Sequence, residues 1–137
     1  MADIKLVLGL KDGKSVQKEL KGAQAEALLG KRLSETVSGD SLGFSGYEFL
    51  ITGGSDICGF PMRKGIQEAR KRVLVSGGVG FSGLKRDGSK QKGVLRRRTV
   101  CGEVVVPTTH QVNMKVVKEG STPLVEPAVT ETAAKKE

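Results

Sequence analysis

Short runs of alternating apolar and polar residues dominate this chain, and they predict strands rather than long helices. Ile4–Leu8, Tyr47–Thr52 and Val112–Val117 each alternate with a period of two residues, which is typical of strands with one buried face. The pair Asp12-Gly13 separates the first run from a second candidate strand at Ser15–Leu20. Because Asp-Gly favours tight turns between strands, these first two runs are expected to form a β-hairpin.

Two further segments, Arg72–Ser76 and Leu95–Val106, contain β-branched residues and are also predicted strands. Between them, residues 77–93 contain six glycines and no hydrophobic period, which predicts a long loop. One short helix is expected at Ala23–Leu29, with Gly30 as its stop. The predicted fold is mainly β: a small β-barrel or strongly curved antiparallel sheet of about six short strands with one short helix.

The length of 137 residues predicts one domain, residues 1–120, which we expect to be barrel-like. Residues 121–137 have no hydrophobic period and are expected to form a flexible tail. No segment approaches the roughly 18 apolar residues of a membrane span, and the N-terminus lacks the order of a secretory signal. The expected location is therefore cytoplasmic, with no membrane partner.

The net charge of +8 is concentrated in one stretch, residues 61–100, which we call the basic segment. It has twelve Lys and Arg residues against Glu68 and Asp87, a balance of +10, while the rest of the chain carries eleven basic and thirteen acidic residues. Such a concentration of positive charge repels itself, and a polyanionic partner that neutralises it is the simplest explanation. Phosphate backbones are the commonest such partner.

Catalytic and metal sites find little support in the sequence. Cys58 and Cys101 are the only cysteines and His110 the only histidine, at spacings unlike any zinc module. Without a signal peptide a disulfide is not favoured, so two reduced, half-buried thiols are expected. The sequence thus predicts no enzyme, no metal, no cofactor and no small-molecule substrate.

The run Gly78–Gly83 matches G-x-G-x-x-G and follows a predicted strand, so a nucleotide-binding enzyme has to be weighed. A dinucleotide site requires a helix that begins at the third glycine and binds the pyrophosphate with its N-terminal amides. The following residues, Leu84–Ser89, contain another turn signal and no helical period. The glycines are better explained by a backbone that lies close against another surface.

The basic segment instead favours nucleic acid. Seven of its twelve basic residues are Arg, three of them consecutive at Arg96–Arg98, and on a strand the middle one points away from the other two. Arg matches phosphate geometry better than Lys, and neighbouring glycine-rich backbone can also approach phosphate oxygens. The chain has only five aromatic residues, so base stacking is disfavoured and shape recognition of folded RNA is expected.

Several motifs resemble the archaeal and eukaryotic small-subunit ribosomal protein S6e family. They are Gly30-Lys31-Arg32, the run Gly46–Asp56 that ends in ITGGSD, the GFPM run with its arginine at Gly59–Arg63, and the segments Arg97–Gly102 and Val116–Gly120. The likeness covers roughly residues 3 to 120, and ITGGSD followed two residues later by GFPM is its most specific part. The shortness of the chain suggests an archaeal member, because eukaryotic members continue into a long basic helix.

This resemblance implies a β-barrel-like domain bound to ribosomal RNA as a structural component of the small subunit, without catalysis. By position, it implies RNA contacts at Lys31, Arg32, Arg63, Arg97 and Arg98. Ile57 and Cys58 stand where the family usually has polar or charged residues, so this loop is expected to pack rather than to face RNA.

The function predicted from the sequence is a structural constituent of the small ribosomal subunit, with ribosomal RNA and neighbouring ribosomal proteins as partners. Two alternatives stay open: a free-standing RNA-binding translation accessory protein, and a nucleotide-binding enzyme that uses Gly78–Gly83. The candidate RNA-binding residues are Lys31, Arg32, Arg63, Lys64, Arg70, Lys71, Arg72, Lys85, Arg86, Lys90, Lys92, Arg96, Arg97 and Arg98.

Overall fold

The computed structural model describes residues 3–121 and 123–124, and within these the fold is mainly β, as predicted. The described part contains seven strands, one short α-helix and one 3-10 helix. In chain order they are β1 (Ile4–Gly9), β2 (Ser15–Leu20), α1 (Ala23–Glu26), β3 (Thr36–Ser38), the 3-10 helix η1 (Gly39–Leu42), β4 (Glu48–Asp56), β5 (Arg70–Val75), β6 (Arg96–Cys101) and β7 (Thr109–Lys118).

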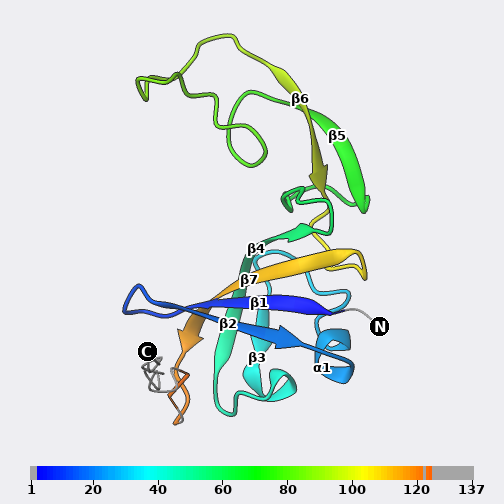
Figure 1. Ribbon diagram of the computed structural model, residues 1–137, viewed down its shortest axis with the longest axis vertical. Helices are drawn as coiled ribbons and strands as arrows, with labels where there is room; N and C mark the ends of the chain where they lie inside the picture. Colours follow the sequence, from blue (N-terminus) through cyan, green and yellow to red (C-terminus); the bar gives the residue numbers. More distant parts are fainter. Residues whose placement is uncertain (1–2, 122, 125–137) are drawn as a thin grey trace, which may run out of the picture.

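Five strands form one sheet in the order β2-β1-β7-β4-β3 (Figure 1). Its pairs are antiparallel except β1 and β7, which run parallel, so the prediction of an antiparallel sheet is wrong at this pair. No closed barrel forms among the described residues, so the predicted barrel or strongly curved sheet is not confirmed. β2 and β3 lie at opposite edges of the sheet, and among the described strands β5 and β6 pair with each other and with no third strand, apart from an isolated bridge between Cys101 and Met62.

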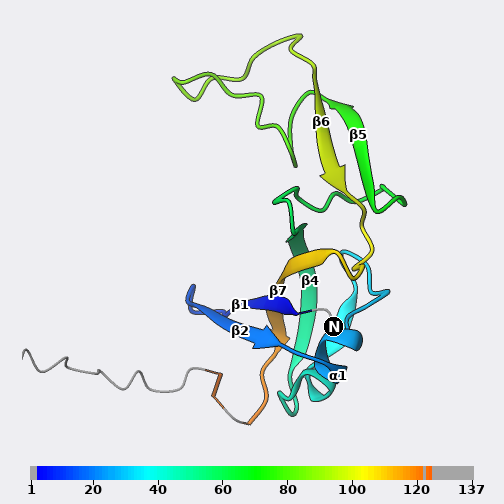
Figure 2. The same cartoon turned by 45° about the vertical axis from the view of Figure 1, so that its right-hand side comes forward.

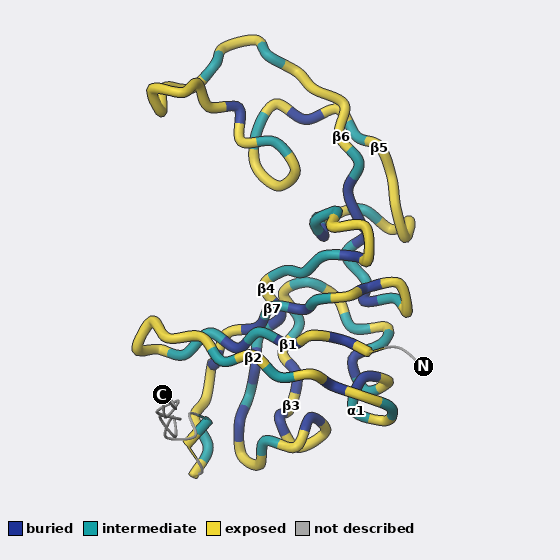
Figure 3. Tube along the Cα trace, in the orientation of Figure 1, coloured by how far each residue is buried: buried dark blue, intermediate teal, exposed yellow. Residues whose placement is uncertain are grey.

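The buried face of this sheet forms the hydrophobic core. Along β1 the side chains of Ile4, Leu6 and Leu8 are buried, while Lys5 between them is exposed, which confirms the predicted alternation. Figure 3 shows that the buried residues gather in the five-stranded sheet. The ring of Phe49 is fully buried and stacks on Tyr47 at 5.7 Å between ring centroids.

The predicted helix is shorter than expected. After Ala27 the hydrogen bonds tighten: the amide of Leu28 donates to the carbonyl of Ala25, three residues back, and the next amide does the same. Gly30, the predicted stop, is left-handed with φ 82°, and its amide donates to the carbonyl of Val105 at 2.9 Å. The segment after the helix is therefore held by the chain that follows β6.

Strand β4 continues through Gly53 and Gly54 to Asp56, beyond the predicted strand at Tyr47–Thr52. A Cβ at Gly54 would overlap the carbonyl oxygen of Gln111 in β7 and lie 2.8 Å from the sulfur of Met62. Glycine here lets two backbones approach closely without ending the strand. The three-residue strand β3 is not among the predicted strands.

The remaining two strands form a separate antiparallel hairpin, in which Arg70 lies opposite Cys101 and Val75 opposite Arg96. We call residues 70–101, which are β5, β6 and the loop between them, the arm. Figures 1 and 2 show that the arm extends away from the five-stranded sheet in both views. Residues 57–69 and 102–108 connect the two parts.

The predicted flexible tail, residues 121–137, lies almost entirely outside the described residues. Within residues 3–121 and 123–124 we find no helix with the length and apolar character needed to span a bilayer.

Candidate nucleic-acid interface

The arm concentrates the unbalanced positive charge of the molecule. It contains ten Lys and Arg residues and one acid, Asp87, and all ten basic residues are exposed. Much of the arm is therefore coloured as exposed in Figure 3, in contrast to the sheet. The ten are Arg70, Lys71, Arg72, Lys85, Arg86, Lys90, Lys92, Arg96, Arg97 and Arg98.

The register of the hairpin distributes these residues over its two faces. Residues directly opposite each other share a face, and neighbours along a strand alternate. One face, which we call the open face, carries Arg70, Arg72, Leu74, Arg97, Thr99 and Cys101. The other, which we call the covered face, carries Lys71, Val73, Val75, Arg96, Arg98 and Val100. Arg96 and Arg98 thus share a face and Arg97 points away from them, as predicted.

The glycine-rich loop packs on the covered face. Val75 and Val100 are buried there, and a Cβ at Gly80 would lie 3.1 Å from Val100 Cγ1. The guanidinium of Arg98 lies over the ring of Phe81, 5.7 Å from its centroid. Residues 76–95 contain no helix, so the strand–turn–helix geometry that a dinucleotide site requires does not form at the G-x-G-x-x-G match.

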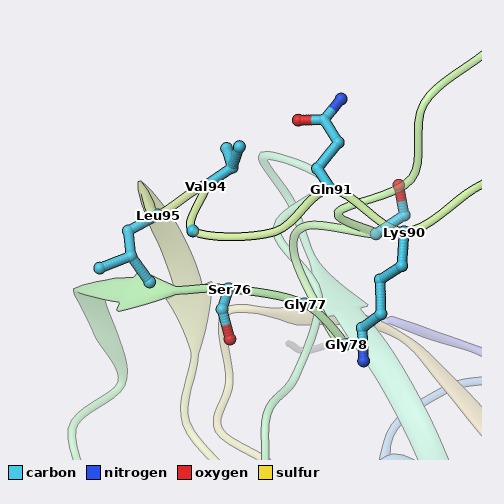
Figure 4. A pocket seen from close by; sticks show the side chains of 9 residues that line it. Ser76, Gly77, Gly78, Lys90, Gln91, Val94 and Leu95 are labelled. Atoms are coloured by element: carbon cyan, nitrogen blue, oxygen red, sulfur yellow. The ribbon is translucent and has the colours of Figure 1, made fainter.

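The loop encloses a recess of about 430 Å³ near the tip of the arm. Figure 4 shows Ser76, Gly77 and Gly78 on one side of it and Lys90 and Gln91, from the returning part of the loop, on the other. Lys90 brings positive charge to a wall that is otherwise largely backbone and neutral side chains. This chemistry suits an anion better than an apolar ligand.

A second recess, of about 510 Å³, lies at the base of the arm. Its lining includes Arg72, Arg97 and Arg98, and no acidic residue. The edge of β6 is free here, since the amide of Cys101 donates to Pro61 but no further strand pairs along the edge in the described residues. Alternation along an antiparallel ladder then directs the amides of Thr99 and Arg97 to this same edge.

Asp56, at the end of β4, joins the arm to the sheet. Its side chain is 4% exposed and accepts hydrogen bonds from the amides of Cys58 at 2.8 Å and Phe60 at 3.2 Å. The Nε of Arg70 donates to its second oxygen at 3.0 Å, and the Arg70 guanidinium lies over the Phe60 ring at 5.1 Å. Arg70 is therefore committed to the joint, and little of its charge is available to a partner.

The protonation of this joint follows from its contacts. Burial alone would raise the pKa of Asp56, but hydrogen bonds from Arg70, the Cys101 thiol and the two amides together hold that pKa below its usual range. Burial, followed by the hydrogen bond with Asp56, raises the pKa of Cys101 to about 11. The joint thus contains a carboxylate and a neutral thiol. Asp56 is not among the residues predicted for the site, although an acid that ends the uncharged ITGGS run was a signal for it.

The remaining predicted residues lie nearer the sheet. Arg32 Nη1 is 3.8 Å from Glu103, whose other oxygen accepts the amide of Gly65 at 2.9 Å. Lys31 forms an ion pair with Glu35 at 2.9 Å. On the arm, Lys71 pairs with Glu68 at 3.0 Å.

Ten of the fourteen predicted residues have no acidic partner among the described residues. One of these, Arg63, donates to the carbonyl of Val79 at 2.9 Å and so holds the loop against the arm. The others are exposed: Lys64, Arg72, Lys85, Arg86, Lys90, Lys92, Arg96, Arg97 and Arg98.

Two expectations about the loop after Asp56 are wrong. Ile57 was expected to pack, but it is 70% exposed, and Cys58 is exposed as well. The cysteines were expected to be half-buried; instead one is exposed and Cys101 is buried, and both are free thiols. The turn is organised by the carboxylate of Asp56, so the side chains that follow it can point outward. In the described part of the chain, no three His, Cys, Asp or Glu residues come together as metal ligands.

Comparison with known proteins connects this geometry to a family. The family described as Ribosomal protein S6e matches residues 4–128. A protein from Archaeoglobus fulgidus named small ribosomal subunit protein eS6 is 42% identical over 118 residues, which cover 85% of this chain and 87% of the relative. A protein of the same name from Methanothermobacter thermautotrophicus is 40% identical over 89% of this chain and 92% of its own length. One from Methanococcus maripaludis is 41% identical over 92% of this chain and 96% of its own length. The chain therefore belongs to the ribosomal protein S6e family.

Proposed function

We propose that this protein is a non-catalytic structural constituent of the small ribosomal subunit that binds folded ribosomal RNA through its arm. The observation that carries the proposal is the charge of the arm: eight of its ten exposed basic residues have no acidic partner among the described residues, on a hairpin that extends from the sheet. The archaeal relatives support the same role by their names.

The physical argument rests on repulsion. Arg96, Arg97 and Arg98 are consecutive, exposed and without acidic partners, so their charges repel one another in the isolated protein. Phosphates that approach the arm relieve this repulsion and release their condensed counterions, which favours binding entropically. Arg63 and Lys64 lie in one of the segments that connect the sheet to the arm, and Arg32 pairs with Val104 in the other.

We propose the cytoplasmic ribosome as the location, and ribosomal RNA and neighbouring ribosomal proteins as the partners. Residues 1–120 would act as one RNA-binding unit. No step of catalysis and no cofactor enters this role.

Sedimentation tests the proposal. The full chain is expected to migrate with small subunits through a sucrose gradient at moderate salt, and a variant with Arg96, Arg97 and Arg98 all changed to Ala is expected to migrate mostly as free protein. A control with Lys5, Lys14 and Lys115 changed to Ala removes the same charge from exposed positions of the sheet and its hairpin. Wild-type protein that stays at the top of the gradient would instead indicate a free-standing accessory factor.

A further inference from the structure

We infer that the open face of the arm lies on the shallow minor groove of double-helical RNA. The inference rests on the proposed function and deepens it, because it names the face of the hairpin that is used and the class of RNA that it fits. It starts from the difference between the two faces.

The covered face is already occupied by the protein. The loop packs over Val75 and Val100, and the Phe81 ring lies under the Arg98 guanidinium. A second surface therefore cannot lie flat against this side without displacing the loop. The open face has no such cover beyond its base, where Cys101 is buried: Leu74 is 57% exposed near the end of β5, and Arg72 and Arg97 are exposed beside it.

The open face combines charge with exposed apolar surface. Leu74 lies opposite Arg97, and Arg72 is the diagonal neighbour of Arg97, at roughly 7 to 8 Å in such a ladder. Leu95, two residues before Arg97 and just outside the strand, is also 57% exposed and lines the recess near the tip of the arm. The pattern is an apolar strip with guanidinium groups beside it. A uniform polyanion would not require the leucines, but a shallow groove in which riboses and base edges lie between the two phosphate strands fits both.

The geometry of double-stranded RNA supplies such a groove. Its major groove is deep and narrow, whereas its minor groove is wide and shallow and displays riboses. A two-stranded ribbon is broad and thin, so it fits a shallow surface. Leu74 and Leu95 would contact ribose, and Arg72 and Arg97 would reach phosphates, one of them at the recess on the free edge of β6.

Single-stranded RNA fits this face less well, because base stacking requires exposed aromatic rings. The chain has four Phe and one Tyr. Phe44, Tyr47 and Phe49 pack together at the sheet. The other two, Phe60 and Phe81, are engaged by arginines, and neither stands on a strand of the open face.

Two charge-matched double variants of the full chain test the inference. Arg72→Ala with Arg97→Ala removes two charges from the open face, and Lys71→Ala with Arg96→Ala removes two from the covered face. All four residues are exposed, so both variants should melt near the wild-type temperature, which circular dichroism checks. On a 20-base-pair RNA duplex the open-face variant should lose at least tenfold in affinity and the covered-face variant less than threefold.

The same protein is also tested with competing nucleic acids. The corresponding single strand and a DNA duplex of the same sequence should bind at least tenfold more weakly than the RNA duplex. Equal losses from the two variants would overturn the choice of face, and equal or tighter binding of the single strand would overturn the choice of duplex. Competition by polyglutamate as strong as by RNA would point to an acidic protein partner and also overturn the inference.

Each of these outcomes leaves the proposed function standing if wild-type protein still binds small-subunit ribosomal RNA. Absence of that binding would overturn both. The two failures are therefore distinguishable.

Discussion

The five-stranded sheet and the arm use apolar residues in opposite ways. The sheet buries its aliphatic side chains in one core with Phe49 and Tyr47, whereas the arm exposes Leu74 and Leu95 and buries little beyond Val75, Val100 and Cys101. Charge is distributed in the reverse sense, with the unpaired arginines on the arm. The contrast teaches that stability and RNA binding should depend on different residues. Each prediction below tests that separation, beginning with the largest effect.

A matched pair of leucines gives the largest contrast. Leu6→Ala empties a fully buried position in the sheet and should lower the free energy of unfolding by about 2 to 5 kcal/mol. Leu74→Ala removes the same atoms from an exposed position on the arm and should change it by no more than about 0.5 kcal/mol. Urea denaturation measures both. Similar losses would show that the arm has a core of its own.

The joint between the two regions comes next. Asp56→Ala leaves the amides of Cys58 and Phe60 and the guanidinium of Arg70 without their acceptor, and should cost about 2 to 3 kcal/mol. The control, Asp87→Ala, removes an exposed acid from the arm loop and should stay within about 0.5 kcal/mol. Thermal unfolding of the two variants decides between a structural and a merely electrostatic role for Asp56.

The adjacent glycines of β4 provide an internal control. Gly54→Ala forces a methyl group against Gln111 and Met62, which should cost about 1 to 3 kcal/mol. Gly53→Ala places the same methyl group in open space, with nothing within 4 Å, and should be tolerated. Equal tolerance at both positions would contradict the close approach of β4 and β7.

The smallest effect concerns pH. The pKa of Asp56 is lower in the folded protein than the unfolded value of about 3.9. Its contribution to stability is thus fully present above that value and is lost as the pH falls through the folded pKa. Denaturation between pH 7 and pH 2 should show a loss at the acid end that Asp56→Asn largely removes. An unchanged profile in this variant would assign the acid sensitivity to other carboxylates.

Patterns among neighbouring residues were enough to predict much of the five-stranded sheet. Alternation predicted β1 and most of β7, because each has one buried face and one exposed face, and the Asp-Gly turn predicted β2. It missed β3, which has three residues and is held mainly by pairing to β4. It also ended β4 too early at Gly53, since the reason for those glycines is close contact with a strand nearly 60 residues further along the chain.

The sequence predicted which basic residues belong to the candidate interface, but not which of them are free to bind a partner. The excess of Arg and Lys in residues 61–100 can be counted from the sequence. Which basic residues lack an acidic partner depends on contacts between distant parts of the chain. Arg70 is hydrogen-bonded to Asp56, 14 residues away, and Arg32 forms an ion pair with Glu103. The closed barrel failed for the same reason, because nothing local says that β5 and β6 leave the sheet.

The dependence of ribosomal RNA binding on salt tests the central claim most directly, namely that the arm meets phosphates while the sheet only supports it. Between 50 and 200 mM salt, six or more phosphate contacts should cost about three orders of magnitude in affinity. In the variant with Arg96, Arg97 and Arg98 changed to Ala, the slope of log affinity against log salt should become shallower by at least about one unit, because Arg97 is expected to reach a phosphate. The variant at Lys5, Lys14 and Lys115 should keep the wild-type slope. A flat wild-type response, or equal changes in both variants, would contradict the account.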